Sequence, residues 1–126
     1  MSKAWIAGLL ASLALPAAAW ATGVRHGSIG HYDALISDAD HYNSEGIRLR
    51  DATAIIRQDR ANVHRHGIVD DADGYDYFFS NPNARAALER MLSVGELSQA
   101  DEVAIVSGVV RVHVDIFPNS VRVKVW

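Results

Sequence analysis

The chain has 126 residues, of which 49% are apolar, with a formal charge of −3 at neutral pH and no cysteine. A chain of this length suits a single domain with a modest core. The absence of cysteine excludes disulfides and cysteine catalysis, and the negative charge gives no electrostatic basis for non-specific binding to nucleic acid.

Residues 1–21 have the features of a secretory signal peptide and are expected to lie outside the fold. A lysine supplies a positive start, residues 5–15 are apolar or small, and Pro16 interrupts the run. Ala19 and Ala21 then place small residues where a signal peptidase requires them. The run is short for a membrane span, so cleavage after Ala21 is favoured over an uncleaved anchor, and no span remains afterwards. The mature protein is therefore expected in the periplasm or outside the cell.

Residues 22–30 contain three glycines and are expected to form a flexible lead-in to one domain spanning residues 31–126. The first predicted helix covers residues 29–43, where apolar residues recur at helical spacing. These residues are Tyr32, Leu35, Ile36, Ala39 and Tyr42. Gly46 follows as a stop, and the short link after it predicts an antiparallel pair with the next helix.

The second predicted helix lies in residues 48–67 and carries a carboxylate on its apolar side. Its stripe consists of Ala52, Ile55, Ile56 and Val63, and Gly67 is a suitable C-terminal stop. Asp59 falls in the middle of this stripe, where burying an unpaired charge is costly. We therefore predict a buried polar network that joins Asp59 to a nearby arginine. The candidates are Arg48, Arg57 and Arg60. The alternative is a functional carboxylate in a pocket.

An acidic and aromatic segment, residues 68–80, has no helical period. With Gly74 at the central glycine position of an EF-hand calcium loop, the first and last positions are Val69 and Ser80, which supply no carboxylate. That calcium site is therefore excluded, and an acidic turn is expected. Weak metal candidates remain without supporting spacing: His64, His66, Asp71 and Asp73.

The same segment contains four closely spaced aromatic residues, which are Tyr75, Tyr77, Phe78 and Phe79. An exposed aromatic cluster is typical of a protein contact surface, so these residues are candidates for binding a partner. The alternative is that some of them cover the helical core.

Two further helices are predicted from their capping residues. Asn81 as the N-cap and Pro82 in the first helical position predict a helix that ends at Gly95. Ser98 predicts another helix over residues 98–107.

The last residues, 110–126, alternate between apolar and polar side chains around a turn at Pro118 and Asn119. The turn fixes the register of a β-hairpin. It places Ile116 opposite Val121, Val114 opposite Val123, Val112 opposite Val125, and Asp115 opposite Arg122. The valine face is expected to cover the third and fourth helices. The open edges of the hairpin would suit pairing with a second copy or with another protein.

Together these elements predict an α+β fold, namely a small bundle of three to four helices followed by a C-terminal antiparallel β-hairpin. No catalytic or nucleotide-binding motif is present, and no cofactor is expected. The favoured function is that of a small exported, non-enzymatic protein that binds another protein. Two alternatives stay open: a periplasmic metal-binding protein that uses scattered His and Asp side chains, and a small hydrolase centred on Asp59.

Overall fold

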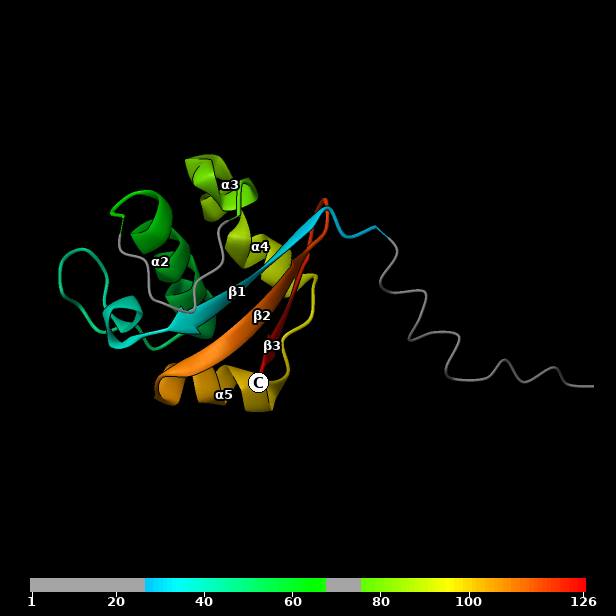
Figure 1. The fold of residues 1–126 in the computed structure, drawn as a ribbon. Helices are drawn as coiled ribbons and strands as arrows, with labels where there is room; N and C mark the ends of the chain where they lie inside the picture. The colour runs from blue at the N-terminus through cyan, green and yellow to red at the C-terminus, as the bar shows by residue number, and fades with distance from the viewer. Residues whose placement is uncertain (1–26, 68–75) are drawn as a thin grey trace, which may run out of the picture.

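The computed structural model describes residues 27–67 and 76–126, which form a mixed α+β structure with four α-helices and one three-stranded antiparallel sheet (Figure 1). In chain order the elements are β1 (Gly30–Ile36), the 3-10 helix η1 (Asp38–His41), α2 (Ala52–His64), the 3-10 helix η2 (Phe78–Ser80), α3 (Pro82–Ala86), α4 (Leu88–Ser93), α5 (Gln99–Ser107), β2 (Val110–Ile116) and β3 (Val121–Val125). A hairpin of β2 and β3 follows the helices, which confirms the predicted fold class.

The C-terminal hairpin has the predicted register. β2 and β3 are antiparallel, and their facing pairs include Ile116 with Val121 and Asp115 with Arg122. The turn is closed by a hydrogen bond of 2.8 Å from the Phe117 N–H to the Ser120 carbonyl. Successive side chains of a strand point to opposite faces, so one face of the hairpin enters the core and the other carries the charged residues.

The predicted helix over residues 29–43 is wrong. The chain there forms β1, which lies beside β2 as the third strand of the sheet, and then η1. Tyr32, Ala34 and Ile36 are buried while the residues between them are not, which is the period of a strand. In so short a segment the apolar residues fit the spacing of a helix as well as that of a strand. The hairpin, in turn, is only marginally stable as two strands alone and gains from a third. Pairing with β2 therefore decides in favour of the strand.

Because residues 30–36 form a strand, the predicted antiparallel pair of helices does not form. α2 lies against η1 and β1 instead. The helix itself starts at Ala52, the first residue of the predicted apolar stripe, and Gly67 follows it with a φ of +67°, a left-handed conformation that glycine favours.

The later helices have the predicted caps and one unpredicted break. The Asn81 side chain accepts a hydrogen bond at the start of α3, and the Ser98 side chain does so at the start of α5. The single helix predicted to end at Gly95 is divided at Ala87 into α3 and α4. No proline or glycine marks this position. Among the residues described, no helix is both long and apolar enough to cross a bilayer.

The core lies between the inner face of the sheet and the helices. Its buried members include Tyr32, Ile36, Ile55, Ile56, Phe79, Leu88, Met91, Ile105, Val112, Val114, Ile116 and Val121. Removing a large apolar side chain from water stabilises the fold by about 1.5–3 kcal/mol. β3 lies against α4 and α5, so the hairpin covers the helices that directly precede it.

The outer edge of β3 is bonded within the chain. The Glu96 N–H donates to the Val121 carbonyl (3.0 Å), and the Val123 N–H donates to the Glu96 carbonyl (2.8 Å). Gly95 permits this approach, because a Cβ atom there would overlap the Val121 carbonyl oxygen. The other edge of the hairpin is paired with β1. Association with a second copy through the hairpin stays a prediction.

Candidate functional site

The buried polar network predicted at Asp59 is centred on Arg60. Both residues lie on α2 and are buried, and Arg60 Nε donates to Asp59 Oδ2 at 2.7 Å. The Arg60 Nη1 atom donates to Asp76 Oδ2, also at 2.7 Å. The guanidinium carbon lies 3.9 Å from the centre of the Tyr32 ring. A cation buried in this way is held by two carboxylates and an aromatic face.

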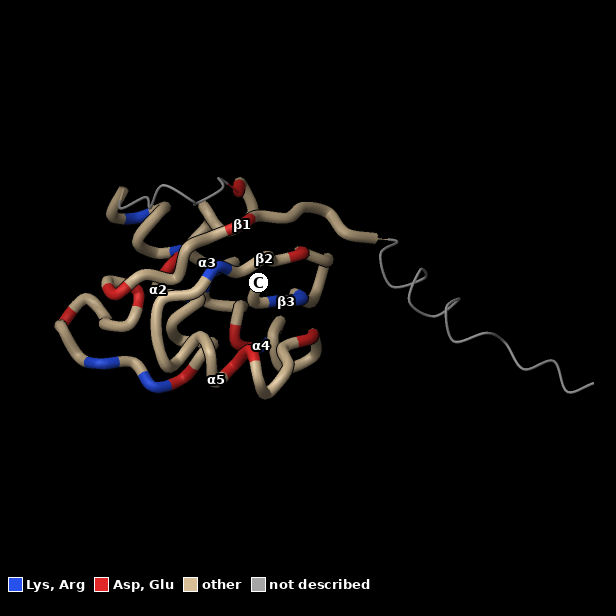
Figure 2. Tube along the Cα trace, turned by 60° about the horizontal axis from the view of Figure 1, so that its bottom comes forward, with Lys and Arg blue, Asp and Glu red and all other residues tan. Residues whose placement is uncertain are grey.

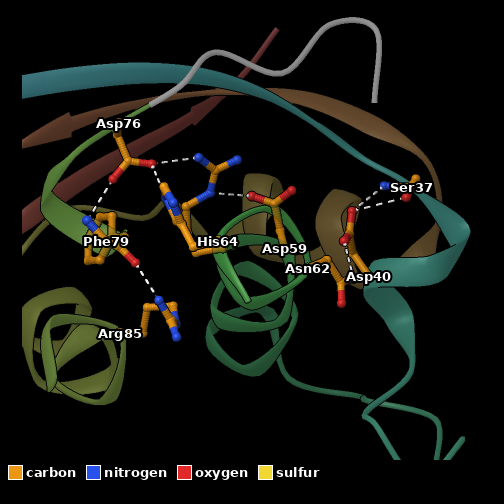
Figure 3. Close-up of polar contacts among 9 residues, drawn as sticks. Ser37, Asp40, Asp59, Asn62, His64, Asp76, Phe79 and Arg85 are labelled. Atoms are coloured by element: carbon orange, nitrogen blue, oxygen red, sulfur yellow. Dashed lines mark hydrogen bonds and ion pairs between the residues drawn. The ribbon is translucent and has the colours of Figure 1, made fainter. Parts of the chain in front are cut away.

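Asp76 connects this network to the segment that follows it (Figure 3). Its Oδ1 atom accepts a hydrogen bond of 2.7 Å from the Phe79 N–H, and its Oδ2 atom lies 3.0 Å from His64 Nε2. Arg85 then donates to the Phe79 carbonyl at 2.8 Å. Charged side chains thus fasten α2, η2 and α3 to one another.

The charge on Arg60 is permanent. Burial acts to lower the pKa of the guanidinium, but electrostatic interactions with Tyr32 and Asp59 and hydrogen bonds to Asp59 and Asp76 outweigh it. The pKa of Arg60 is therefore raised above its ordinary value, and the guanidinium does not lose a proton at physiological pH. This arrangement suits a structural role.

Of the three arginines considered for Asp59, only Arg60 pairs with it. Arg57 is exposed on the other side of α2. Arg48 is also exposed, and it lies over the ring of Tyr42 with its guanidinium carbon 5.4 Å from the ring centre. Asp76 was not predicted as a member. The sequence gives one indication of its role: Asp76 lies three residues before Phe79, and an aspartate side chain often accepts a hydrogen bond from a nearby backbone N–H.

A second buried carboxylate, Asp40, joins η1 to α2. It accepts hydrogen bonds of 2.8 Å from the Ser37 N–H and from the Asn62 side chain. Next to it, His41 is buried with one ring nitrogen 2.7 Å from the Ser37 carbonyl and the other 2.8 Å from the Ile105 carbonyl. These contacts hold η1 against α2 and α5.

The aromatic residues predicted to contact a partner are divided between the core and the surface. Phe79 is 0% exposed and packs edge-on against Tyr32 and Phe78, while Phe78 is half-buried. Tyr77 is 83% exposed. Tyr75 lies outside the described residues. Phe79 is therefore inaccessible to a partner, and Tyr77 is the most exposed of the three aromatic residues that the structure describes.

Of the four weak metal candidates, the structure describes His64 and His66, and these two have different surroundings. His64 is bonded to Asp76 inside the network, whereas His66 is exposed beyond the end of α2. Asp71 and Asp73 fall outside the described residues. Within residues 27–67 and 76–126, no group of three or more His, Cys, Asp or Glu side chains is arranged to hold a metal ion.

The side of the sheet that faces away from the core, which we call the outer face, carries a second set of polar side chains. It is formed by alternate residues of the three strands. They are His31, Asp33 and Leu35 of β1, Arg111, His113 and Asp115 of β2, and Arg122 and Lys124 of β3.

His113 lies at the centre of the outer face between two carboxylates. Its Nδ1 atom is 2.6 Å from Asp33 Oδ1, and its Nε2 atom is 3.2 Å from Asp115 Oδ1. The His31 ring lies next to it, with the ring centres 5.6 Å apart. The hydrogen bond to Asp33 raises the pKa of His113 above its ordinary value against the effect of partial burial, and Asp115 adds to the rise.

A row of ion pairs continues from His113 across the edge of β3. Arg122 Nε donates to Glu96 Oε2 at 2.9 Å, and Arg122 Nη1 lies 3.9 Å from Asp115. A cleft of about 870 Å³ opens here, lined by Ser28, Glu96, His113, Asp115, Arg122 and Lys124 among others. Figure 2 shows the basic positions of β3 beside an acidic position of β2.

The outer face could be found only in part from the sequence. The pairing of Asp115 with Arg122 follows from the hairpin register, which the sequence predicts. The contribution of His31 and Asp33 does not follow, because a helix over residues 29–43 places them far from His113.

The outer face ends in an exposed basic and aromatic corner. Arg111 and Lys124 are exposed, and Trp126 is 70% exposed. The Trp126 N–H donates to the Arg111 carbonyl at 3.1 Å, which places these two residues side by side.

Comparison of the chain with protein-family models, curated proteins and solved structures found no match.

Proposed function

We propose that this chain is a small exported, non-enzymatic protein that binds another protein through the outer face of its sheet. The observation that carries the proposal is the corner where an exposed Trp126 adjoins Arg111. Tryptophan and arginine are enriched among the residues that supply most of the binding energy of protein interfaces. Export rests on the signal-peptide composition of residues 1–21.

The rest of the outer face provides suitable surroundings for such an anchor. Protein interfaces have a polar, solvent-accessible rim around their central contacts. The row from Asp33 through His113 and Asp115 to Arg122 is polar and partly exposed, and its ion pairs hold the side chains in defined positions. A surface ordered before binding loses less side-chain entropy when a partner arrives.

Tyr77 is a second candidate contact, because it is 83% exposed. The hydrolase alternative gains no support from Asp59, which is enclosed with Arg60 rather than open to a substrate. The metal-binding alternative gains none from the described residues, where no group of three or more His, Cys, Asp or Glu side chains is arranged to hold a metal ion.

Site-specific photo-crosslinking tests the proposal. A photoreactive amino acid is placed at Arg111 or Lys124 in the full-length chain, which is produced in the cells that normally make it. The same amino acid at Arg90, an exposed residue of α4, serves as the control. We expect a discrete protein adduct from the two outer-face positions and none from Arg90.

The pattern of adducts decides the outcome. Adducts of the same mass from all three positions would show random collision and contradict the proposal. The absence of any adduct from Arg111 and Lys124 would also contradict it. An adduct of twice the mass of the chain would identify the partner as a second copy.

A further inference from the structure

Four side-chain carboxylates of the outer face and its rim are bonded to donors within the described part of the chain. Asp33 and Asp115 both contact His113, and Glu96 contacts Arg122. The carboxylate of Asp101, at the same rim, accepts a hydrogen bond of 3.3 Å from the Val125 N–H. An approaching molecule therefore meets these four side-chain carboxylates already bonded to a donor within the chain.

Two cations of the same face are not engaged in this way. Arg111 and Lys124 are exposed and form no ion pair with any residue in the described part of the chain. They lie on adjacent strands, on either side of the pairing between β2 and β3. The chain as a whole has a charge of −3, so these two cations belong to a protein that is negative overall.

We propose that the segment docked on the outer face is acidic, with its carboxylates near Arg111 and Lys124 and an apolar side chain against Trp126. This inference rests on the proposed function and adds the chemistry of the partner. Electrostatic complementarity supports it, because the free groups at an interface meet groups of opposite sign. A nucleic acid is disfavoured, because closely spaced phosphates would also approach the carboxylates of Asp33, Asp115 and Glu96.

A peptide titration followed by NMR tests this chemistry without knowledge of the natural partner. The probe is a synthetic peptide with repeated Glu-Leu-Ser units, and matched peptides carry Gln or Lys in place of Glu. We expect the Glu peptide to shift the amide signals of Arg111, His113 and Lys124. The Gln and Lys peptides should leave these signals in place.

Variants then show whether the two cations are responsible. Lys124→Gln and Arg111→Gln should each weaken binding of the Glu peptide about threefold, as expected for exposed charge pairs, and added salt should have a similar effect. Arg90→Gln is the matched control, because it removes an exposed arginine from another surface. It should leave the affinity unchanged.

Three results would overturn the inference. They are equal binding of the Gln peptide, shifts centred on α4 rather than on the outer face, and stronger binding of a single-stranded oligonucleotide than of the Glu peptide. If the crosslinking experiment finds a partner and the Glu peptide fails, the inference is lost while the proposed function stands. If crosslinking fails at Arg111 and Lys124, the proposed function is lost whatever the peptide does.

Discussion

Two regions of this molecule contain the same grouping of side chains, in which a basic side chain lies between two carboxylates. On α2, Arg60 lies between Asp59 and Asp76 with its side chain 0% exposed. On the outer face, His113 lies between Asp33 and Asp115 with its side chain 38% exposed. The difference in exposure separates their roles, because ionic contacts strengthen and become obligatory as water is removed. The inner group (Asp59, Arg60 and Asp76) fixes the fold, and the outer group (Asp33, His113 and Asp115) stays accessible to solvent.

The largest expected effect is the loss of a carboxylate from the inner group. Asp59→Ala leaves the buried Arg60 with one fewer counter-charge, and breaking a buried ion pair in this way costs about 3–5 kcal/mol of unfolding free energy. The matched change on the outer face, Asp33→Ala, should cost less than about 1 kcal/mol, since exposed pairs contribute little. Urea unfolding of both variants measures the contrast. If both variants lost a similar amount of unfolding free energy, the difference in exposure would not explain the roles of the two groups.

A smaller effect is expected from pH. The pKa of His113 is raised in the folded state, so the folded chain binds this proton more tightly than the unfolded chain. The resulting stabilisation is complete below the unfolded value of about 6.5 and is lost as the pH rises through the folded-state pKa. Its size should be under about 1 kcal/mol, because the pair is partly exposed.

The measurement for this second prediction is the urea midpoint of wild type and His113→Gln across that pH range. The advantage of wild type should shrink as the pH rises. Arg60 keeps its charge across this pH range, so the arginine of the inner group adds no pH dependence to the stability. An advantage that grows with pH would contradict the assignment of His113 as the protonated partner of Asp33.

The smallest effect on stability is expected at the free cations. Lys124→Gln and Arg111→Gln should change the unfolding free energy by no more than about 0.5 kcal/mol, because neither residue is buried or ion-paired among the described residues. Thermal unfolding provides the check. A large loss at either position would make it a structural residue and place it with the inner group.

Much of the fold follows from local sequence. The apolar stripe of α2, the caps at Asn81 and Ser98, and the register of the hairpin each depend on residues within a few positions of one another. The strand β1 could not be predicted in the same way, because its short apolar run fits two periods. Its conformation is set by β2, which lies far along the chain.

The two charged groups differ in the same respect. Asp59 is recognisable from sequence, since a carboxylate within an apolar stripe requires a partner, and Arg60 is its neighbour. Asp33 and His113 are separated by the whole helical part of the chain and meet only because β1 pairs with β2. No spacing rule brings such residues together before the strand order is known.

The bonding of β3 to Glu96 and Asp101 has a consequence for the protein in concentrated solution. Sheets lengthen and fibrils grow when an incoming strand finds unused amide groups along an edge. The amides of Val123 and Val125 already have acceptors inside the molecule, so a fibril template is missing at these two positions. A chain that has no cysteine crosslinks can thus carry a valine-rich strand at the edge of its sheet with a lower risk of self-templated aggregation.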